Sequence, residues 1–115
     1  MRLSDLSKEE RLALIGWAKL VIRADKEFTN EEAEELKKLA VEMGTGLFNE
    51  AVADAKAQLK SVDDLKVLAE KITSQEAREL IFSVLYDIAV PGTIVDSEAR
   101  VLQWLAKTWN VYSPI

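Results

Sequence analysis

The sequence predicts an all-α fold, a compact bundle of about six helices in a single domain that spans residues 1–115. Apolar residues recur at helical spacing, and strict alternation of apolar and polar residues is missing throughout. Only four Gly and two Pro are present, too few for a turn-rich β-sandwich. Four segments carry the pattern of a capping box at a helix start, in which a hydroxyl residue is followed three positions later by an acid. They are Ser7 and Glu10, Thr29 and Glu32, Ser61 and Asp64, and Thr73 and Glu76.

These signals place the expected helices at 8–24, 30–43, 47–59, 62–71, 74–89 and 97–109. The first helix is apolar around most of its circumference, and the fifth also has a wide apolar face, so we expect both to be central in the bundle. The second helix should end at Gly44-Thr45-Gly46, where glycine supplies a left-handed C-cap. Pro91-Gly92 should end the fifth.

Composition excludes several classes of function. With 49% hydrophobic and 30% charged residues, the chain should fold as a globular domain. The lack of Cys and His removes disulfides, thiolate zinc sites, nucleophilic thiols and imidazole bases. A net charge of -5 disfavours binding to nucleic acid. The N-terminus lacks a signal-peptide core and the longest apolar region is too short and polar to be inserted in a membrane, so we expect a soluble, cytoplasmic protein.

A unit of helix, acidic turn and helix is used twice in the sequence. The segment Asp25–Ala33 aligns with Pro91–Ala99, and a long apolar helix precedes each segment. The matched pairs are Phe28 with Ile94, Glu32 with Glu98, and Ala33 with Ala99. Two such units packed face to face would form a compact bundle.

This repeated unit resembles the TerB-like family, named for tellurite-resistance protein B, over roughly residues 11–111. The family pattern is an apolar helix, then Ala-Asp-Gly, a polar and an aliphatic residue, and Glu on the next helix. The first copy reads Ala24–Phe28 with Glu32, and Lys26 replaces the usual Gly. In the second copy Pro91 replaces the usual Asp. The resemblance implies a helical domain, divalent-metal binding by the acidic turns, and a link to stress response and tellurite resistance in membrane-associated complexes.

The first acidic turn allows two interpretations. Asp25 and Glu27 alternate along the turn, and Glu32 lies one helical turn further on, so three carboxylates are available to a hard cation such as Ca²⁺, Mg²⁺ or Mn²⁺. Such a site would have few protein ligands and would bind weakly. Alternatively, Thr29 and Glu32 form a helix cap and Asp25 accepts hydrogen bonds within the turn.

Two further features suggest a protein partner. Trp104 falls at the edge of the apolar stripe of the last helix, where a large aromatic ring either anchors an interface or closes the core. Lys19 and Arg23 share one face of the first helix, where they can meet an acidic partner or pair with acids of the second helix. Trp17 and Trp109 are expected in the core.

The function predicted from these observations is a small helical interaction module that docks a protein partner and binds a divalent cation weakly at the first acidic turn. No recognisable catalytic constellation is present, so we do not expect an enzyme. Two alternatives stay open: an enzyme with a carboxylate–metal centre, and a purely structural subunit that is stable as a homodimer.

The metal and cap interpretations predict different effects of Asp25→Asn. If the turn binds a cation, this variant reduces the rise in melting temperature that the cation produces. If the turn is only a cap, Thr29→Ala costs about 1 kcal/mol with or without cation, and the effect of Asp25→Asn does not depend on cation either. Thermal unfolding in millimolar Ca²⁺, Mg²⁺ or Mn²⁺ makes the distinction. A wild-type melting temperature that none of them moves would contradict a metal site.

Overall fold

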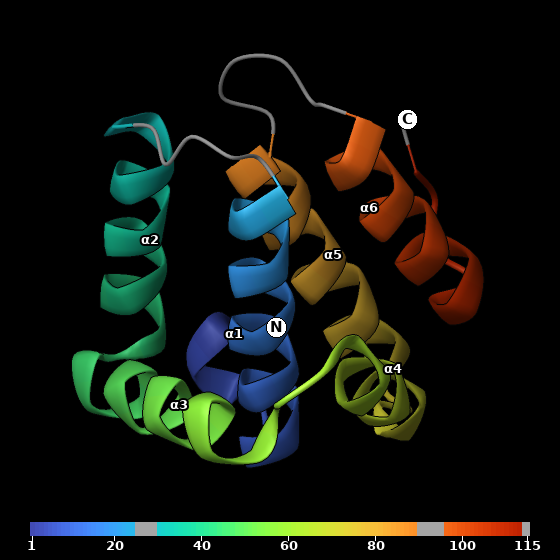
Figure 1. Cartoon of the computed structure of the whole chain (residues 1–115). Coiled ribbons are helices and arrows are strands. Elements are labelled where there is room, and N and C mark those ends of the chain that lie inside the picture. Colours follow the sequence, from blue (N-terminus) through green and yellow to red (C-terminus); the bar gives the residue numbers. More distant parts are fainter. Residues whose placement is uncertain (25–29, 90–95, 114–115) are drawn as a thin grey trace.

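The computed structural model of the chain is helical throughout its ordered elements (Figure 1). It describes residues 1–24, 30–89 and 96–113, without the side chains of Arg23, Ala24, Glu31, Glu32 and Asp96. A short 3₁₀ turn, η1 (Leu3–Asp5), precedes the helices α1 (Lys8–Ala24), α2 (Asn30–Met43), α3 (Thr45–Gln58), α4 (Val62–Lys71), α5 (Gln75–Ala89) and α6 (Asp96–Trp109). Within these ranges no residue belongs to a β-strand. The predicted all-α class is confirmed, and the predicted boundaries agree within two residues.

Two of the predicted capping boxes are present. Before α1, the backbone N–H of Ser7 donates to Glu10 Oε1 (2.7 Å), and the N–H of Glu10 donates to Ser7 Oγ (3.2 Å). Before α4, Ser61 and Asp64 exchange the same pair of bonds at 3.2 and 3.3 Å. Each pair satisfies two backbone donors that the first helical turn leaves without partners. Thr29, of a third predicted box, lies outside the described residues.

The predicted capping box at Thr73 and Glu76 is wrong by one residue. Helix α5 begins at Gln75, so the capping position falls on Ser74, whose Oγ accepts a hydrogen bond from the N–H of Ala77 at 3.3 Å. Both Thr73 and Ser74 offer a hydroxyl, and the acid at position 76 favoured the wrong one. With alanine at the third helical position, the reciprocal side-chain bond of a capping box is not available.

The connection between α2 and α3 is shorter than predicted. Helix α3 begins at Thr45 instead of residue 47, and Gly44 alone separates the two helices. Its φ of 101° lies in the region that glycine adopts without steric cost. The glycine turn therefore joins α2 to α3 almost directly, and Gly46 lies inside α3.

Helix α1 is the centre of the bundle, as its sequence predicted. It packs against α3, α4, α5 and α6, and the other helices surround it (Figure 1). Its side chains at Ala13, Leu14, Trp17 and Val21 are almost completely buried. A helix with neighbours on several sides needs apolar residues around most of its circumference, which the sequence of α1 supplies.

Helix α5 is the second central element and carries the predicted division of faces. Ala77, Ile81, Leu85 and Ile88 are buried, whereas the polar stripe on the opposite face is exposed. Its members are Glu76, Glu79, Ser83 and Asp87. α5 packs against α1, α2 and α6, so the core is continuous from one side of the bundle to the other.

The two predicted repeats do not pack alike. In the second repeat, α5 and α6 contact each other directly. In the first repeat, which consists of α1 and α2, the described residues of α2 make their main contacts with η1, α3 and α5. Leu3 and Leu6, at the N-terminus, are buried in the same core as Leu39 and Met43 of α2. α1 and α5 end, and α2 and α6 begin, at the same end of the bundle (Figure 1).

The two core tryptophans, buried as predicted, differ in their hydrogen bonding. Trp109 is 0% exposed, and its Nε1–H donates to the backbone oxygen of Ala69 at 2.8 Å, which links α6 to α4. Trp17 is 1% exposed, and its Nε1 has no hydrogen-bond partner in the described structure. An unpaired buried donor opposes folding, whereas a paired one stabilises it modestly.

This difference predicts unequal costs for the same substitution. Trp109→Phe and Trp17→Phe remove the same atoms from the core, but only Trp109→Phe breaks a hydrogen bond. We therefore expect Trp109→Phe to lower the free energy of unfolding by about 1–2 kcal/mol more than Trp17→Phe does. Urea denaturation of both variants measures the difference. Equal losses would show that the bond from Trp109 to Ala69 does not stabilise the fold.

Candidate functional site

The predicted cation ligands are not tested by the structure. Asp25 and Glu27 lie outside the described residues, and only the backbone of Glu32 is described, in the first turn of α2. Among the described side chains no group of three or more acids converges in a way that could hold a metal ion. Glu98, the counterpart of Glu32 in the second repeat, is 1% exposed and is not left without a partner. A cation site at Asp25, Glu27 and Glu32 stays a prediction.

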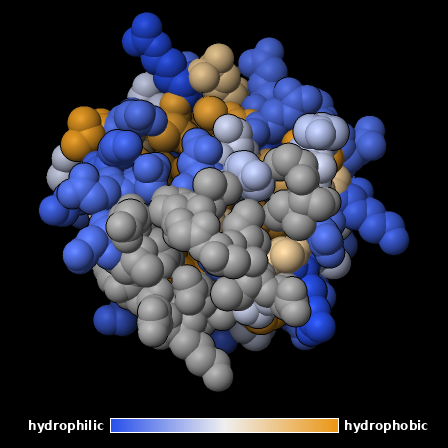
Figure 2. Space-filling model, turned by 90° about the horizontal axis from the view of Figure 1, so that it is seen from above, coloured by the Kyte–Doolittle hydropathy of each residue, from blue (hydrophilic) through white to orange (hydrophobic). Residues whose placement is uncertain are grey.

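The end of the bundle where α1 ends and α2 begins is viewed in Figure 2. Around its rim the described surface is mostly hydrophilic, and hydrophobic side chains appear there in small groups. Single or small groups of exposed apolar side chains are normal on a soluble domain and do not by themselves mark an interface. The described part of this end therefore gives no reason to place a docking surface there.

Trp104 closes one edge of the core. It is half-buried, and its ring stacks on that of Trp17 with centroids 5.5 Å apart and an interplanar angle of 22°. The ammonium group of Lys66, from α4, lies 5.2 Å from the centroid of the Trp104 ring. Both the stacking and the cation–π contact stabilise this position of the ring. The position at the edge of the apolar stripe is confirmed, whereas a role as an interface anchor stays a prediction.

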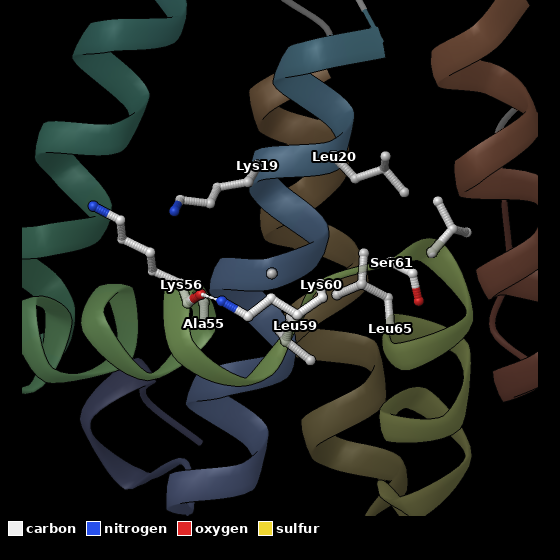
Figure 3. Close-up of a pocket in the computed structure, with 10 residues that line it drawn as sticks. Lys19, Leu20, Ala55, Lys56, Leu59, Lys60, Ser61 and Leu65 are labelled. Atoms are coloured by element: carbon white, nitrogen blue, oxygen red, sulfur yellow. Dashed lines mark hydrogen bonds between the residues drawn. The ribbon is translucent and has the colours of Figure 1, made fainter.

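Lys19, a predicted interaction residue, lines a cavity of about 280 Å³ between α1, α3 and α4. We call this cavity the lysine cleft. Its apolar lining consists of Gly16, Leu20, Ala55, Leu59, Val62 and Leu65, and its polar lining of Lys19, Lys56, Lys60 and Ser61. Figure 3 shows that Lys19 and Lys56 extend toward α2, whereas Leu20, Ser61 and Leu65 lie on the side of α4. The cleft is therefore cationic on one side and mainly apolar on the other.

Gly16 allows α3 and α4 to come close to α1 at the floor of the cleft. A Cβ atom built on this glycine would lie 2.5 Å from Leu59 Cδ1 and 2.6 Å from Leu65 Cδ2. Real Cβ atoms do not approach other carbons so closely, so any larger residue would displace both leucine side chains. The missing side chain thus lets Leu59 and Leu65 cover the middle of α1 and form an apolar floor.

The cleft concentrates positive charge in an acidic protein. The chain has 15 basic and 20 acidic residues, yet three lysines and no acid line this cavity. Ion pairs between described side chains join Lys8 to Glu50 and Asp54, and Lys38 to Glu35, and none involves a lysine of the cleft. The pairing expected between Lys19 and acids of the second helix is therefore not formed in the described structure.

The backbone at the start of α4 contributes little to anion binding. Asp64 Oδ2 accepts hydrogen bonds from the N–H groups of Lys60 and Ser61, and Ser61 Oγ accepts from the N–H of Asp64. This cap satisfies two of the donors at the helix terminus, the N–H groups of Ser61 and Asp64, and it places the Asp64 carboxylate where an anion would otherwise approach. Lys60 Nζ also donates to the backbone oxygen of Lys56 at 2.9 Å, at the end of α3. Attraction of an anion therefore depends mainly on the ammonium groups of Lys19 and Lys56.

Sequence reasoning singled out Lys19 but not Lys56 or Lys60, which line the same cavity. Two signals pointed to them: the lysines are four residues apart at the end of one predicted helix, and a capping box follows them directly. Gly16, isolated within a strongly helical pattern, was a third signal, since such a glycine often marks a close approach. The side chain of Arg23, predicted to act with Lys19, is outside the described structure.

Negative charge gathers on another surface, where α5 faces α2. The pKa of the Asp87 carboxyl is raised above its ordinary value of 3.8, first by partial burial and then by the carboxylates of Glu35 and Glu42, while Lys38 opposes the shift. Asp87 therefore costs less to protonate in the folded protein than in the unfolded chain. On this surface the carboxylates of Glu35 and Glu42 repel that of Asp87, whereas the cleft is lined by lysines.

The raised pKa predicts how Asp87→Asn changes stability with pH. Because the folded state holds the proton more tightly than the unfolded state, the ionised carboxylate destabilises the fold, and stability falls as pH rises from about 3.8 through the folded pKa. Asp87→Asn should therefore raise the melting temperature at pH 7, and the gain should vanish as pH falls below 3.8.

Glu79→Gln is the matched control for that measurement, since it removes an equal charge from the same exposed face of α5. A gain at pH 7 that is larger for Asp87→Asn than for Glu79→Gln isolates the local repulsion from the effect of net charge. Equal gains for the two variants would contradict a special role of Glu35 and Glu42 near Asp87.

Comparison with known proteins finds no match for this chain. The chain matches no protein-family model, and it has no significant match among curated proteins or solved structures. None of the helices, over the residues that the structure describes, combines the length and the apolar character needed to cross a bilayer. The function is therefore argued from the lysine cleft itself.

Proposed function

We propose that this domain is a small interaction module that uses the lysine cleft to dock an acidic segment of a protein partner. One observation carries the proposal: three lysines and an apolar floor converge on one cavity in a chain of net charge -5. Positive side chains above an apolar floor fit a segment in which carboxylates lie beside an aliphatic residue. Complementary charge gives such docking its specificity and its rate of association.

The size of the cleft favours a side chain over a larger ligand. Its volume of about 280 Å³ is at or below the lower end of typical small-molecule sites, which occupy roughly 300–1,000 Å³. An aliphatic side chain would lie against Leu59 and Leu65, and carboxylates on either side of it would approach Lys19 and Lys56. Exposed ion pairs contribute little each, so the affinity depends on both the apolar and the charged contacts.

The resemblance to the TerB-like family is compatible with this proposal and separate from it. The resemblance and the first acidic turn support a weak divalent-cation site at Asp25, Glu27 and Glu32 and a link to stress response in the cytoplasm. That turn joins α1 to α2, whereas the cleft is formed by α1, α3 and α4. A cation site and the lysine cleft are therefore separate features, and the loss of one proposal leaves the other standing.

A short fluorescein-labelled peptide in which glutamates flank a leucine tests the proposal by fluorescence anisotropy. The wild-type protein should bind this peptide and should lose affinity when the glutamates become glutamines or the leucine becomes serine. The double variant Lys19→Glu, Lys56→Glu should weaken binding by about tenfold or more, because both charges of the rim then repel the peptide.

The control compares two single variants, Lys56→Glu and Lys107→Glu. Lys107 is exposed in the last turn of α6 and does not line the cleft, so its reversal changes net charge as much as Lys56→Glu does. We expect Lys56→Glu to weaken binding and Lys107→Glu to leave it nearly unchanged. Equal losses would indicate a nonspecific charge effect, and no binding by wild type at millimolar peptide would contradict the proposal.

A further inference from the structure

A second surface of the same chain has the chemistry that the lysine cleft requires. On α2, Val41 is 76% exposed, although valine is usually buried. Around it lies a shallow hollow lined by Glu34, Lys37, Lys38 and Glu42. We call these five residues, with the adjoining Glu35 and Asp87, the α2 face. It presents an exposed aliphatic side chain beside two glutamates and two lysines, with the carboxylates of Glu35 and Asp87 adjoining them.

The charge of the α2 face is negative despite its two lysines. Four carboxylates, those of Glu34, Glu35, Glu42 and Asp87, outnumber the ammonium groups of Lys37 and Lys38. Lys38 Nζ lies 3.4 Å from Glu35 Oε1, so one of the two lysines already has a partner. The carboxylates of Glu35 and Glu42 lie close enough to Asp87 to raise the pKa of its carboxyl by repulsion. A cationic surface brought against this face would relieve that repulsion.

The two surfaces form no ion pair with each other within the described part of one molecule. The lysine cleft is built from α1, α3 and α4, and the α2 face from α2 and α5, and no residue belongs to both. A positive cavity with an apolar floor and a negative surface with a projecting valine are nevertheless complementary in charge and in shape. Another copy of the same chain carries the surface that is complementary to the cleft.

We propose that the α2 face of one copy docks in the lysine cleft of a second copy, with Val41 against the floor of the cleft and Glu34 and Glu42 facing Lys19 and Lys56. This inference rests on the proposed function, because it names the occupant of the same cleft. Two different patches meet in such a contact, so association is head to tail and forms rings or open chains instead of a symmetric dimer. The contact is small and exposed, so it is weak and sensitive to salt.

Sedimentation velocity of the wild-type protein over a range of concentrations is the first test. The average sedimentation coefficient should rise with concentration at low ionic strength, and the rise should shrink when salt is added. Two double variants then reverse the charge of one surface each: Lys19→Glu with Lys56→Glu in the cleft, and Glu34→Lys with Glu42→Lys on the α2 face. Alone, each variant brings surfaces of like charge together and should stay monomeric.

An equimolar mixture of the two double variants is the decisive sample. In the mixture, the acidic cleft of one variant meets the basic α2 face of the other, and the second contact keeps its native charges, so association should return. Circular dichroism checks that each variant folds. Association of either variant alone, or a mixture that stays monomeric although the wild type associates, would overturn the head-to-tail contact.

The outcomes also separate this inference from the proposed function. A wild-type protein that stays monomeric at every concentration, yet binds the glutamate–leucine peptide in its cleft, overturns self-association and leaves the docking module intact. A protein that neither associates nor binds the peptide overturns both. Association that the cleft variant does not weaken shows that copies meet through other surfaces, which overturns the inference as well.

Discussion

The close approach of the Leu59 and Leu65 side chains to α1 at Gly16 is the constraint on which the lysine cleft depends. α1 is central, so most of its positions must contact a neighbouring helix. At position 16 Leu59, directly after α3, and Leu65 of α4 meet α1, and their terminal carbons lie where a side chain would otherwise begin. Glycine in a helix interior lowers stability by roughly 0.5–1 kcal/mol relative to alanine. Here the absent side chain leaves room for the three helices to meet closely.

The lysine cleft is a consequence of that meeting. Leu59 directly follows the last residue of α3 and Leu65 lies in the first turns of α4, so the chain between them crosses close to α1 and brings Lys60 and Ser61 to the rim. The lysines at the end of α3 also suit the negative end of its helix dipole, which explains part of their placement without any partner. Lys19 has no such explanation, because it lies inside α1 and has no ion pair with a described side chain.

Local patterns predicted the helices, and tertiary contacts determined the cleft. The periodicity of α1 and α6 predicted the burial of Trp17 and Trp109, and the box at Ser61 predicted the start of α4, because these features depend on residues a few positions apart. The choice between Thr73 and Ser74 failed because both carry a hydroxyl and the acid at position 76 favoured Thr73, whereas the helix begins one residue later. The cleft joins Lys19 to Lys56, which are far apart in the sequence, and no local pattern records that they meet. The first acidic turn lies outside the described residues, so its role stays a prediction.

Amide NMR of the ¹⁵N-labelled protein during titration with the glutamate–leucine peptide tests most directly whether the cleft is the binding surface. The account predicts shifts that saturate together at residues from all three helices of the cleft, namely Gly16 and Lys19 of α1, Lys56 of α3 and Leu65 of α4. Amides of α6 that lie away from the cleft should move little. Shifts confined to α5 and α6, or no shifts at millimolar peptide, would contradict the account.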